Sequence, residues 1–251
     1  MFLPFHRYQT RFFSLAAAFR VVPALAIFLW TAGLFAAGPS ALTVEPDTVI
    51  LWGLNEGEGM VFGDQVGGVE LKVTSPDGKE PTWVEGKFGK ALSFPGGVSL
   101  GASSTKSPVP ELSTGEVTVE AWLKPSEEGA GKPMGILQMS GFRAVIGPNG
   151  TVTWLVAADG QTNNEVGATT KGKLPYGEWS HVAMTYNGSV LRVFINGEIA
   201  AEHEFAGANI QPATMSGVII GYFGGAEKPY FIGDINGIRI SNKARSEFPV
   251  P

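Results

Sequence analysis

The 251-residue chain contains no cysteine. This absence excludes disulfide bonds, thiolate metal sites and cysteine nucleophiles. It also excludes a membrane anchor built on a lipid-modified cysteine. Many exported domains of this size are held together by disulfide bonds, so the stability of this chain must come from its core.

Charged residues are also scarce, at 16% of the chain, whereas 44% of the residues are hydrophobic. Disordered chains show the opposite balance, so we expect a sizeable buried core. Residues 42–251 hold 15 basic and 23 acidic side chains, which gives a formal net charge of −8. Nucleic-acid binding needs a basic face, so this acidic body argues against nucleic acid as a partner. A cation site or a neutral ligand is compatible with it.

The first 41 residues carry three arginines and no acidic residue, and they include the uncharged apolar run Val21–Ala37. A basic stretch followed by an apolar run is typical of a secretory signal. The run has 17 residues, at the lower limit for crossing a bilayer. Residues 1–41 are therefore predicted to be a signal peptide, with a weak cleavage point after Ser40, or else an N-terminal membrane anchor through residues 21–37. Both alternatives place the rest of the chain outside the cytoplasm.

Helical patterns are almost absent from Leu42 onward, and short apolar runs are separated by Gly, Pro, Asn and Asp. In Val117–Leu123 the apolar residues alternate strictly with Thr118, Glu120 and Trp122, which is the pattern of a half-buried strand. Strands are expected at Thr48–Leu54, Gly68–Val73, Ala91–Phe94, Val98–Leu100, Val117–Leu123, Gly135–Met139, Phe142–Ile146, Thr151–Ala157, Trp179–Tyr186, Val190–Ile195, Glu198–Phe205, Val218–Phe223 and Ile235–Ser241.

Two Asn-Gly pairs, Asn187-Gly188 and Asn196-Gly197, join three of these runs. Asn-Gly is the strongest short-range signal for a tight hairpin, so the pairs predict a three-stranded meander. About a dozen short strands with no dividing linker indicate an all-β, antiparallel two-sheet sandwich. We expect one domain at residues 44–245, followed by a loose tail at 246–251.

Five blocks in this order resemble the laminin-G-like, concanavalin A-like lectin/glucanase family of jelly-roll modules found in bacterial extracellular proteins. The resemblance covers nearly all of residues 50–245. The blocks are Trp52–Gly59 with Asp64 and Gly67-Gly68, then Trp83–Phe94, Val117–Pro125, Gly177–Gly197 and Phe231–Arg245. It implies a jelly-roll sandwich.

The resemblance also implies a calcium site at one edge of the sandwich. Asp64 and a carbonyl of Gly67 would supply ligands from the opening block. The closing pattern of the family, Gly-x-Ile-Asp-Glu, is here Gly233-Asp234-Ile235-Asn236-Gly237, so Asn236 replaces a carboxylate. Asn can still offer an oxygen to Ca²⁺, and Asp234 could compensate if a bulge turned it round. The alternative is that these are polar turn and edge residues without a metal.

Carbohydrate binding is the second candidate role. Asn163-Asn164 and the segment Tyr222–Tyr230 combine amides with aromatic rings in loop-like sequence. Rings can stack on sugars, and amides bond hydroxyl groups. Asn163, Asn164, Tyr222 and Tyr230 are therefore candidate ligand-binding residues, against the plain alternative of turn chemistry.

Catalysis has the least support. Retaining glucanases of this fold carry Glu-x-Asp-x-x-Glu on one strand, where two carboxylates flank the scissile bond. This chain has Glu116 and Glu120 around Val-Thr-Val, with no Asp between them. His181 lies within a buried-strand pattern, which favours a structural role.

The sequence therefore predicts a non-catalytic exported recognition module for a glycan or another surface ligand, with calcium as an additional expected cofactor. A structural or adhesive protein–protein module is the first alternative, and a glycoside hydrolase of unrecognised type is the second. The expected partners are glycans or extracellular proteins, and the membrane only if the N-terminal segment is not cleaved.

Overall fold

The computed structural model describes residues 42–102, 115–139, 141–157, 165–205, 218–224 and 228–249. The chain divides into two compact units, residues 1–36 and 37–251, and every described residue belongs to the second. The predicted signal or anchor segment therefore lies outside the described residues. Within the described ranges, no helix is long and apolar enough to span a membrane.

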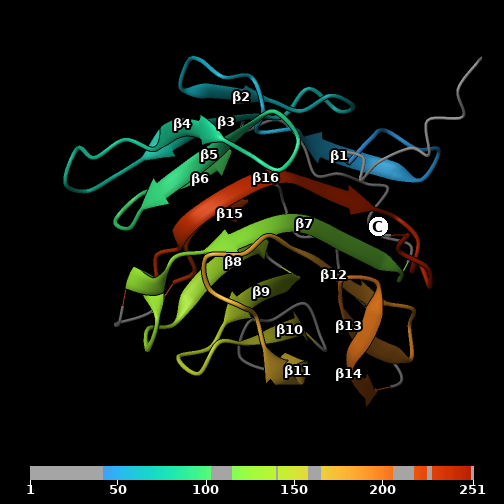
Figure 1. The fold of residues 1–251 in the computed structure, drawn as a ribbon. Helices are drawn as coiled ribbons and strands as arrows, with labels where there is room; N and C mark the ends of the chain where they lie inside the picture. The colour runs from blue at the N-terminus through green and yellow to red at the C-terminus, as the bar shows by residue number, and fades with distance from the viewer. Residues whose placement is uncertain are drawn as a thin grey trace, which may run out of the picture. The chain divides into compact units, whose positions relative to one another are not determined.

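The described residues form two antiparallel sheets of eight strands each (Figure 1). The first sheet has the order β14-β13-β12-β7-β16-β5-β4, and β1 pairs with β16 beside this path. Its strands are β1 (Thr48–Trp52), β4 (Thr82–Glu85), β5 (Lys90–Pro95), β7 (Val117–Pro125), β12 (Ser180–Tyr186), β13 (Val190–Ile195), β14 (Glu198–Glu204) and β16 (Ile232–Ser241).

The second sheet has the order β11-β10-β9-β8-β15-β6-β3-β2. Its strands are β2 (Val61–Gly63), β3 (Glu70–Thr74), β6 (Ser99–Ala102), β8 (Met134–Met139), β9 (Phe142–Ile146), β10 (Thr151–Ala157), β11 (Glu165–Lys173) and β15 (Ile219–Ile220). Among the described residues, one 3₁₀ turn, η2 (Glu127–Gly129), follows β7. Two antiparallel sheets with this strand order confirm the predicted jelly-roll sandwich.

All thirteen predicted strand segments overlap observed strands, and three observed strands were not predicted. The three are β2, β4 and β11. The first two have three and four residues, too few to show a period of two. In β11 the sequence EVGATTKGK has few apolar side chains and two glycines, because this strand lies at an edge of the second sheet.

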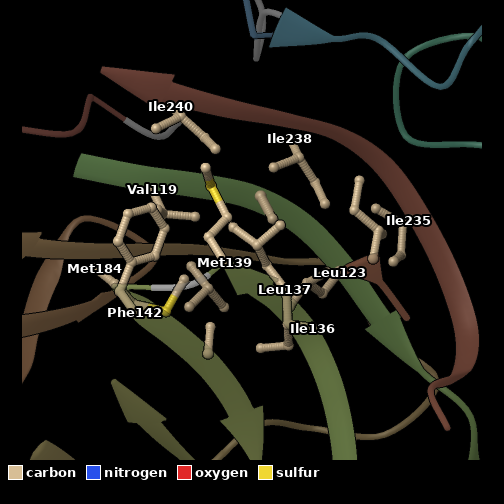
Figure 2. Close-up of a cluster of buried hydrophobic side chains, with 14 of the residues drawn as sticks. Val119, Leu123, Ile136, Leu137, Met139, Phe142, Met184, Ile235, Ile238 and Ile240 are labelled. Atoms are coloured by element: carbon tan, nitrogen blue, oxygen red, sulfur yellow. The ribbon is translucent and has the colours of Figure 1, made fainter. Parts of the chain in front are cut away.

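The core lies between the two sheets and takes its side chains from both. Figure 2 shows Leu123 and Ile238 of the first sheet facing Ile136, Leu137 and neighbouring residues of the second. These side chains have no exposed surface. Because the alternation along β7 places every second residue in this layer, hydrophobic burial fixes the register of the strand.

Strand β16 changes its partner halfway along its length. Its first residues pair with β5, and its last pair with β1, through Trp52 and Ile238 among others. The register against β7 shifts between Ile235 and Ile238, which marks a bulge at the change of partner. Asn236 lies in this bulge and is 2% exposed.

The outer face of the first sheet carries a buried ionic cluster. Glu120 is bonded by Arg239, with Nε and Nη2 of the guanidinium 2.8 and 2.6 Å from Oε2. Arg239 also donates to the carbonyl of Thr43 at 2.9 Å and to Glu45 at 2.7 Å. The stretch that precedes β1 therefore covers this face, and the side chain of Glu120 is only 3% exposed.

The end of the described chain covers the same sheet. Phe248 is 6% exposed, and its ring lies 4.7 Å from that of Phe194 and 5.8 Å from that of His181, measured between centroids. Phe248 lies in the segment predicted as a loose tail at 246–251, and these two ring contacts hold it against the first sheet.

Candidate functional site

Two of the predicted ligand-binding residues, Tyr222 and Tyr230, come together at the end of β15. They form an isolated antiparallel bridge. Gly221, directly before Tyr222, has a φ of 80°, a conformation that favours glycine. The N–H of Phe231, directly after Tyr230, donates to the carbonyl of Gly221 at 2.8 Å.

The residues next to this tyrosine bridge are bonded to β8 of the second sheet on both sides. Gly221 donates its N–H to the carbonyl of Ile136, and Gly135 donates its own to the carbonyl of Pro229, both at 3.0 Å. The backbone of Tyr222 lies directly over Gly135. A Cβ at position 135 would lie 2.4 Å from the carbonyl carbon of Tyr222, so only glycine permits this approach.

The two tyrosine rings stack on each other. Their centroids lie 4.6 Å apart and their planes are inclined by 32°. Both side chains remain half-buried, so part of the stacked pair faces solvent. Burial raises the pKa of Tyr230, and the neighbouring Tyr222 and Asp77 raise it further. Its hydroxyl therefore stays neutral near physiological pH and can both donate and accept a hydrogen bond.

Polar groups border the stacked pair. The N–H of Gly224 donates to Oε1 of Gln138 at 3.0 Å. The guanidinium of Arg143 lies over the ring of Phe223, with its carbon 5.3 Å from the centroid, and forms an ion pair with Glu165. We call Tyr222, Phe223, Tyr230 and Gln138 the tyrosine rim, and the carboxylate of Asp77 lies close enough to Tyr230 to raise its pKa. The rim offers three aromatic rings, two of them stacked, and one amide, with one carboxylate nearby.

Asn163 and Asn164, the other predicted ligand-binding residues, lie outside the described residues. Their role stays a prediction.

Asp64, the first predicted calcium ligand, organises a turn. Its Oδ1 accepts the N–H groups of Leu51 and Val66 at 2.8 and 3.0 Å, and its Oδ2 accepts that of Gly67 at 2.5 Å. Gly67 thus contributes its N–H to Asp64. These three backbone N–H donors use much of the hydrogen-bonding capacity of the Asp64 carboxylate without a metal ion.

Asn236 and Asp234 also have protein partners. Oδ1 of Asn236 accepts the N–H of Phe88 at 2.8 Å, and its Nδ2 donates to the carbonyl of Lys90 at 2.9 Å. Asn236 thereby joins the bulge of β16 to the β4–β5 turn. Asp234 forms an ion pair with Lys124 at 3.4 Å.

Three of the four predicted calcium ligands, Asp64, Asp234 and Asn236, already have protein partners, so their arrangement lends calcium binding no support. Across the described part of the chain, no group of three or more His, Asp or Glu side chains could hold a metal ion. Calcium binding stays a prediction of the sequence.

The buried cluster around Glu120 is a feature that sequence reasoning missed. Oε1 of Glu120 lies 3.4 Å from Nε2 of His181, while Oε2 is held by Arg239. Burial alone would raise the pKa of Glu120, but hydrogen bonds and charge from His181 and Arg239 lower it below its ordinary value. The carboxylate of Glu120 is thus enclosed by its protein partners, with a side chain that is 3% exposed.

A family model described as the concanavalin A-like lectin/glucanases superfamily, Laminin_G_3, matches residues 99–249. This match covers more than half of the chain, so the chain belongs to that family. Among curated proteins, none matches the sequence significantly.

Several solved structures share the fold. One is domain 4 of AbnA, a GH43 extracellular arabinanase from Geobacillus stearothermophilus, which was solved with arabinotriose. It matches with a TM-score of 0.56 and 20% identity, and the match covers 79% of this chain and 93% of that one.

Two toxin domains also share the fold. The binding domain of Paraclostridial Mosquitocidal Protein 1 has a TM-score of 0.58 and 16% identity. The binding domain of botulinum neurotoxin DC, solved with rat synaptotagmin II, has a TM-score of 0.61 and 12% identity. The chain spans about half the length of these two toxin domains, and 79% of it is covered in each match. At these identities the likeness shows the fold alone.

Proposed function

We propose that this protein is a non-catalytic carbohydrate-binding module that holds its ligand at the tyrosine rim. The observation that carries the proposal is the half-exposed stack of Tyr222 and Tyr230, fixed in position by β8. A rigid aromatic surface beside an amide and a carboxylate matches the two faces of a sugar ring, which are apolar in the middle and polar at the edge.

The comparisons support this proposal without deciding it. The arabinanase domain was solved with arabinotriose, and a toxin binding domain of the same fold was solved with a protein, rat synaptotagmin II. The protein-binding alternative finds less support in the first sheet, because the chain's own terminal segments cover the outer face around Glu120 and His181. A partner could not dock on that part of the face without displacing them.

The proposal of a non-catalytic role depends on Glu116 and Glu120, the two acidic residues that flank Val-Thr-Val in the sequence. Glu120 is enclosed with Arg239 and His181, and Glu116 accepts the N–H of Ala244 at 3.3 Å. Neither carboxylate is arranged as the acid or nucleophile of a glycosidase, which must flank the scissile bond.

Binding to a panel of immobilised neutral polysaccharides, namely arabinan, xylan, β-glucan and mannan, tests the proposal. Tyr222→Ala and Tyr230→Ala should each weaken binding to any polysaccharide retained by the wild type at least about fivefold, since a central aromatic contact contributes more than about 1 kcal/mol. Ile199→Ala is the matched control, because Ile199 is 59% exposed on β14, at an edge of the other sheet.

Two results would contradict the proposal. One is retention of no polysaccharide by the wild-type protein. The other is equal binding by both tyrosine variants and the wild type, which would place the ligand elsewhere.

Calcium binding at Asp64, Gly67, Asp234 and Asn236 is a separate proposal. Millimolar Ca²⁺ should raise the melting temperature, and a chelator should reverse the rise, because a ligand that binds only the folded state stabilises it. An unchanged melting temperature would remove this proposal and leave Asp64 and Asn236 with the structural roles described above.

Export is proposed from the N-terminal sequence. Cleavage after Ser40 would leave Thr43 and Glu45 in place to bond Arg239. N-terminal sequencing of protein recovered from outside the cytoplasm tests this cleavage point. A mature chain that begins beyond Glu45 would contradict cleavage after Ser40, because Thr43 and Glu45 would no longer cover Glu120.

A further inference from the structure

The residues that follow Tyr230 alternate between the core and the outside. Phe231 and Ile235 have no exposed surface and belong to the core between the sheets. Tyr230, Ile232 and Asp234 are only partly buried, although Ile232 also packs against the core. Successive side chains of an extended chain point to opposite faces, so Tyr230, just before β16, lies on the same side as Ile232 and Asp234 in the first residues of that strand.

Two of the three residues line a groove with a volume of about 380 Å³. Ile232 and Asp234 form one side, and Ser93, Lys124 and Ser126 are among the residues that complete it. Ser93 is paired with Asp234 across β5 and β16, and Lys124 is paired with Asp234 across β7 and β16. The volume lies within the range of about 300–1,000 Å³ that is usual for small-ligand sites.

Backbone contacts fix the segments around this groove. Gly233 has a φ of 140°, and a Cβ there would lie 2.3 Å from the carbonyl oxygen of Lys124. The N–H of Ser126 donates to the carbonyl of Ile232 at 2.9 Å, and that of Gly177 donates to the carbonyl of Pro125 at 2.7 Å. Ser93, Lys124 and Asp234 are held on the paired strands β5, β7 and β16.

The groove is acidic. Lys124 is its one lysine, and the carboxylates of Asp234, Glu127 and Glu128 also line it. Glu127 and Glu128 are exposed in η2, while the side chain of Asp234 is 15% exposed and lies 3.4 Å from the ammonium of Lys124. A polyanionic chain would be repelled here, whereas hydroxyl groups of a neutral ligand can bond carboxylate, ammonium and serine.

We propose that this groove is a second subsite for the ligand of the tyrosine rim, and that the ligand is a linear neutral oligosaccharide running along β16 from Tyr230 to Asp234. This inference depends on the proposed function. Four residues of extended strand separate the two positions, about 13 Å. A single sugar ring is too short to reach both, so the proposed ligand is a chain.

Calorimetric titration with linear oligosaccharides from dimer to hexamer, in the arabinose, xylose, glucose and mannose series, tests this proposal. The wild-type protein should bind the hexamer of its preferred series at least about tenfold more tightly than the dimer, because a hydrogen bond to a charged group contributes about 1.5–3 kcal/mol. Asp234→Ala should retain the affinity for the dimer and lose most of this advantage.

Two further variants keep the test decisive. Ser93→Ala removes a hydroxyl from the groove without touching the ion pair, and it should reduce the advantage of the hexamer to a smaller extent. Glu198→Ala removes an exposed carboxylate from β14 and should change nothing. Thermal unfolding of each variant shows that it is folded.

The outcomes separate the two proposals. Equal affinity of the wild type for dimer and hexamer, or an unchanged hexamer advantage in Asp234→Ala and Ser93→Ala, would overturn the second subsite and leave the tyrosine rim standing. Tighter binding of polygalacturonate than of the neutral chains would overturn the neutral class. Failure of every saccharide to bind would overturn the proposed function itself.

Discussion

Arg239→Met should be among the most damaging single substitutions on the outer face of the first sheet. The methionine retains much of the volume of the side chain, but it removes the bonds that Arg239 donates to Glu120, Glu45 and the carbonyl of Thr43. Glu120, whose side chain is only 3% exposed, keeps its contact with His181 but loses its guanidinium partner. Removing one partner of a buried ion pair costs about 3–5 kcal/mol of folding free energy.

Urea unfolding followed by tryptophan fluorescence measures this loss. In a domain of this size, a loss of that magnitude lowers the melting temperature by roughly 10 °C. Arg192→Met is the matched control, because Arg192 pairs with Glu202 on the same sheet with side chains 30% and 44% exposed. Its loss should stay below about 1 kcal/mol.

The destabilisation caused by Arg239→Met should also depend on pH. The folded-state pKa of Glu120 is lowered below its ordinary value of 4.5. The stability that its ionised form contributes is therefore present above pH 4.5 and is lost as the pH falls through the folded-state pKa. The difference between wild type and Arg239→Met should shrink on acidification over this range. Equal losses for Arg239→Met and Arg192→Met at neutral pH would refute the reasoning.

Two other substitutions test how the site is held. Gly135→Ala should lower stability by about 1–3 kcal/mol and displace the tyrosine bridge, because the new Cβ would lie 2.4 Å from the carbonyl carbon of Tyr222; an unchanged unfolding midpoint with unchanged saccharide affinity would contradict this. Asn236→Ala should cost about 1–3 kcal/mol, since the N–H of Phe88 and the carbonyl of Lys90 lose their partner. A loss below about 0.5 kcal/mol in urea unfolding would show that water replaces the amide.

The strand pattern could be predicted from the sequence because burial of one face imposes a period of two. Val117–Leu123 is the clearest case, and its apolar residues do face the core. The same alternation places Glu120 and Trp122 on the opposite face, where exposure would be expected. Both are buried, because residues 43–45 and the 87–88 turn cover them. These covering segments have no periodicity, so nothing in the local sequence could indicate where they pack.

The sequence indicates which residues could form the candidate site, but it does not indicate how these residues are arranged. It predicts Tyr222 and Tyr230 as loop aromatics beside polar residues. Their stacking depends on the close approach to Gly135, almost ninety positions earlier in the chain, and such a contact leaves no local signal. The closing block Gly233–Gly237 predicts a calcium ligand at Asn236. In the structure, Asn236 lies in the bulge of β16 and makes hydrogen bonds to the β4–β5 turn.

Titration of the aromatic ring resonances by nuclear magnetic resonance, with an oligosaccharide retained in the panel assay, tests the central claim most directly. The ring signals of Tyr222 and Tyr230 should shift progressively and saturate together, while those of the enclosed Trp122 stay fixed. Saturating shifts confined to other aromatic residues, with both tyrosines unmoved, would contradict the account.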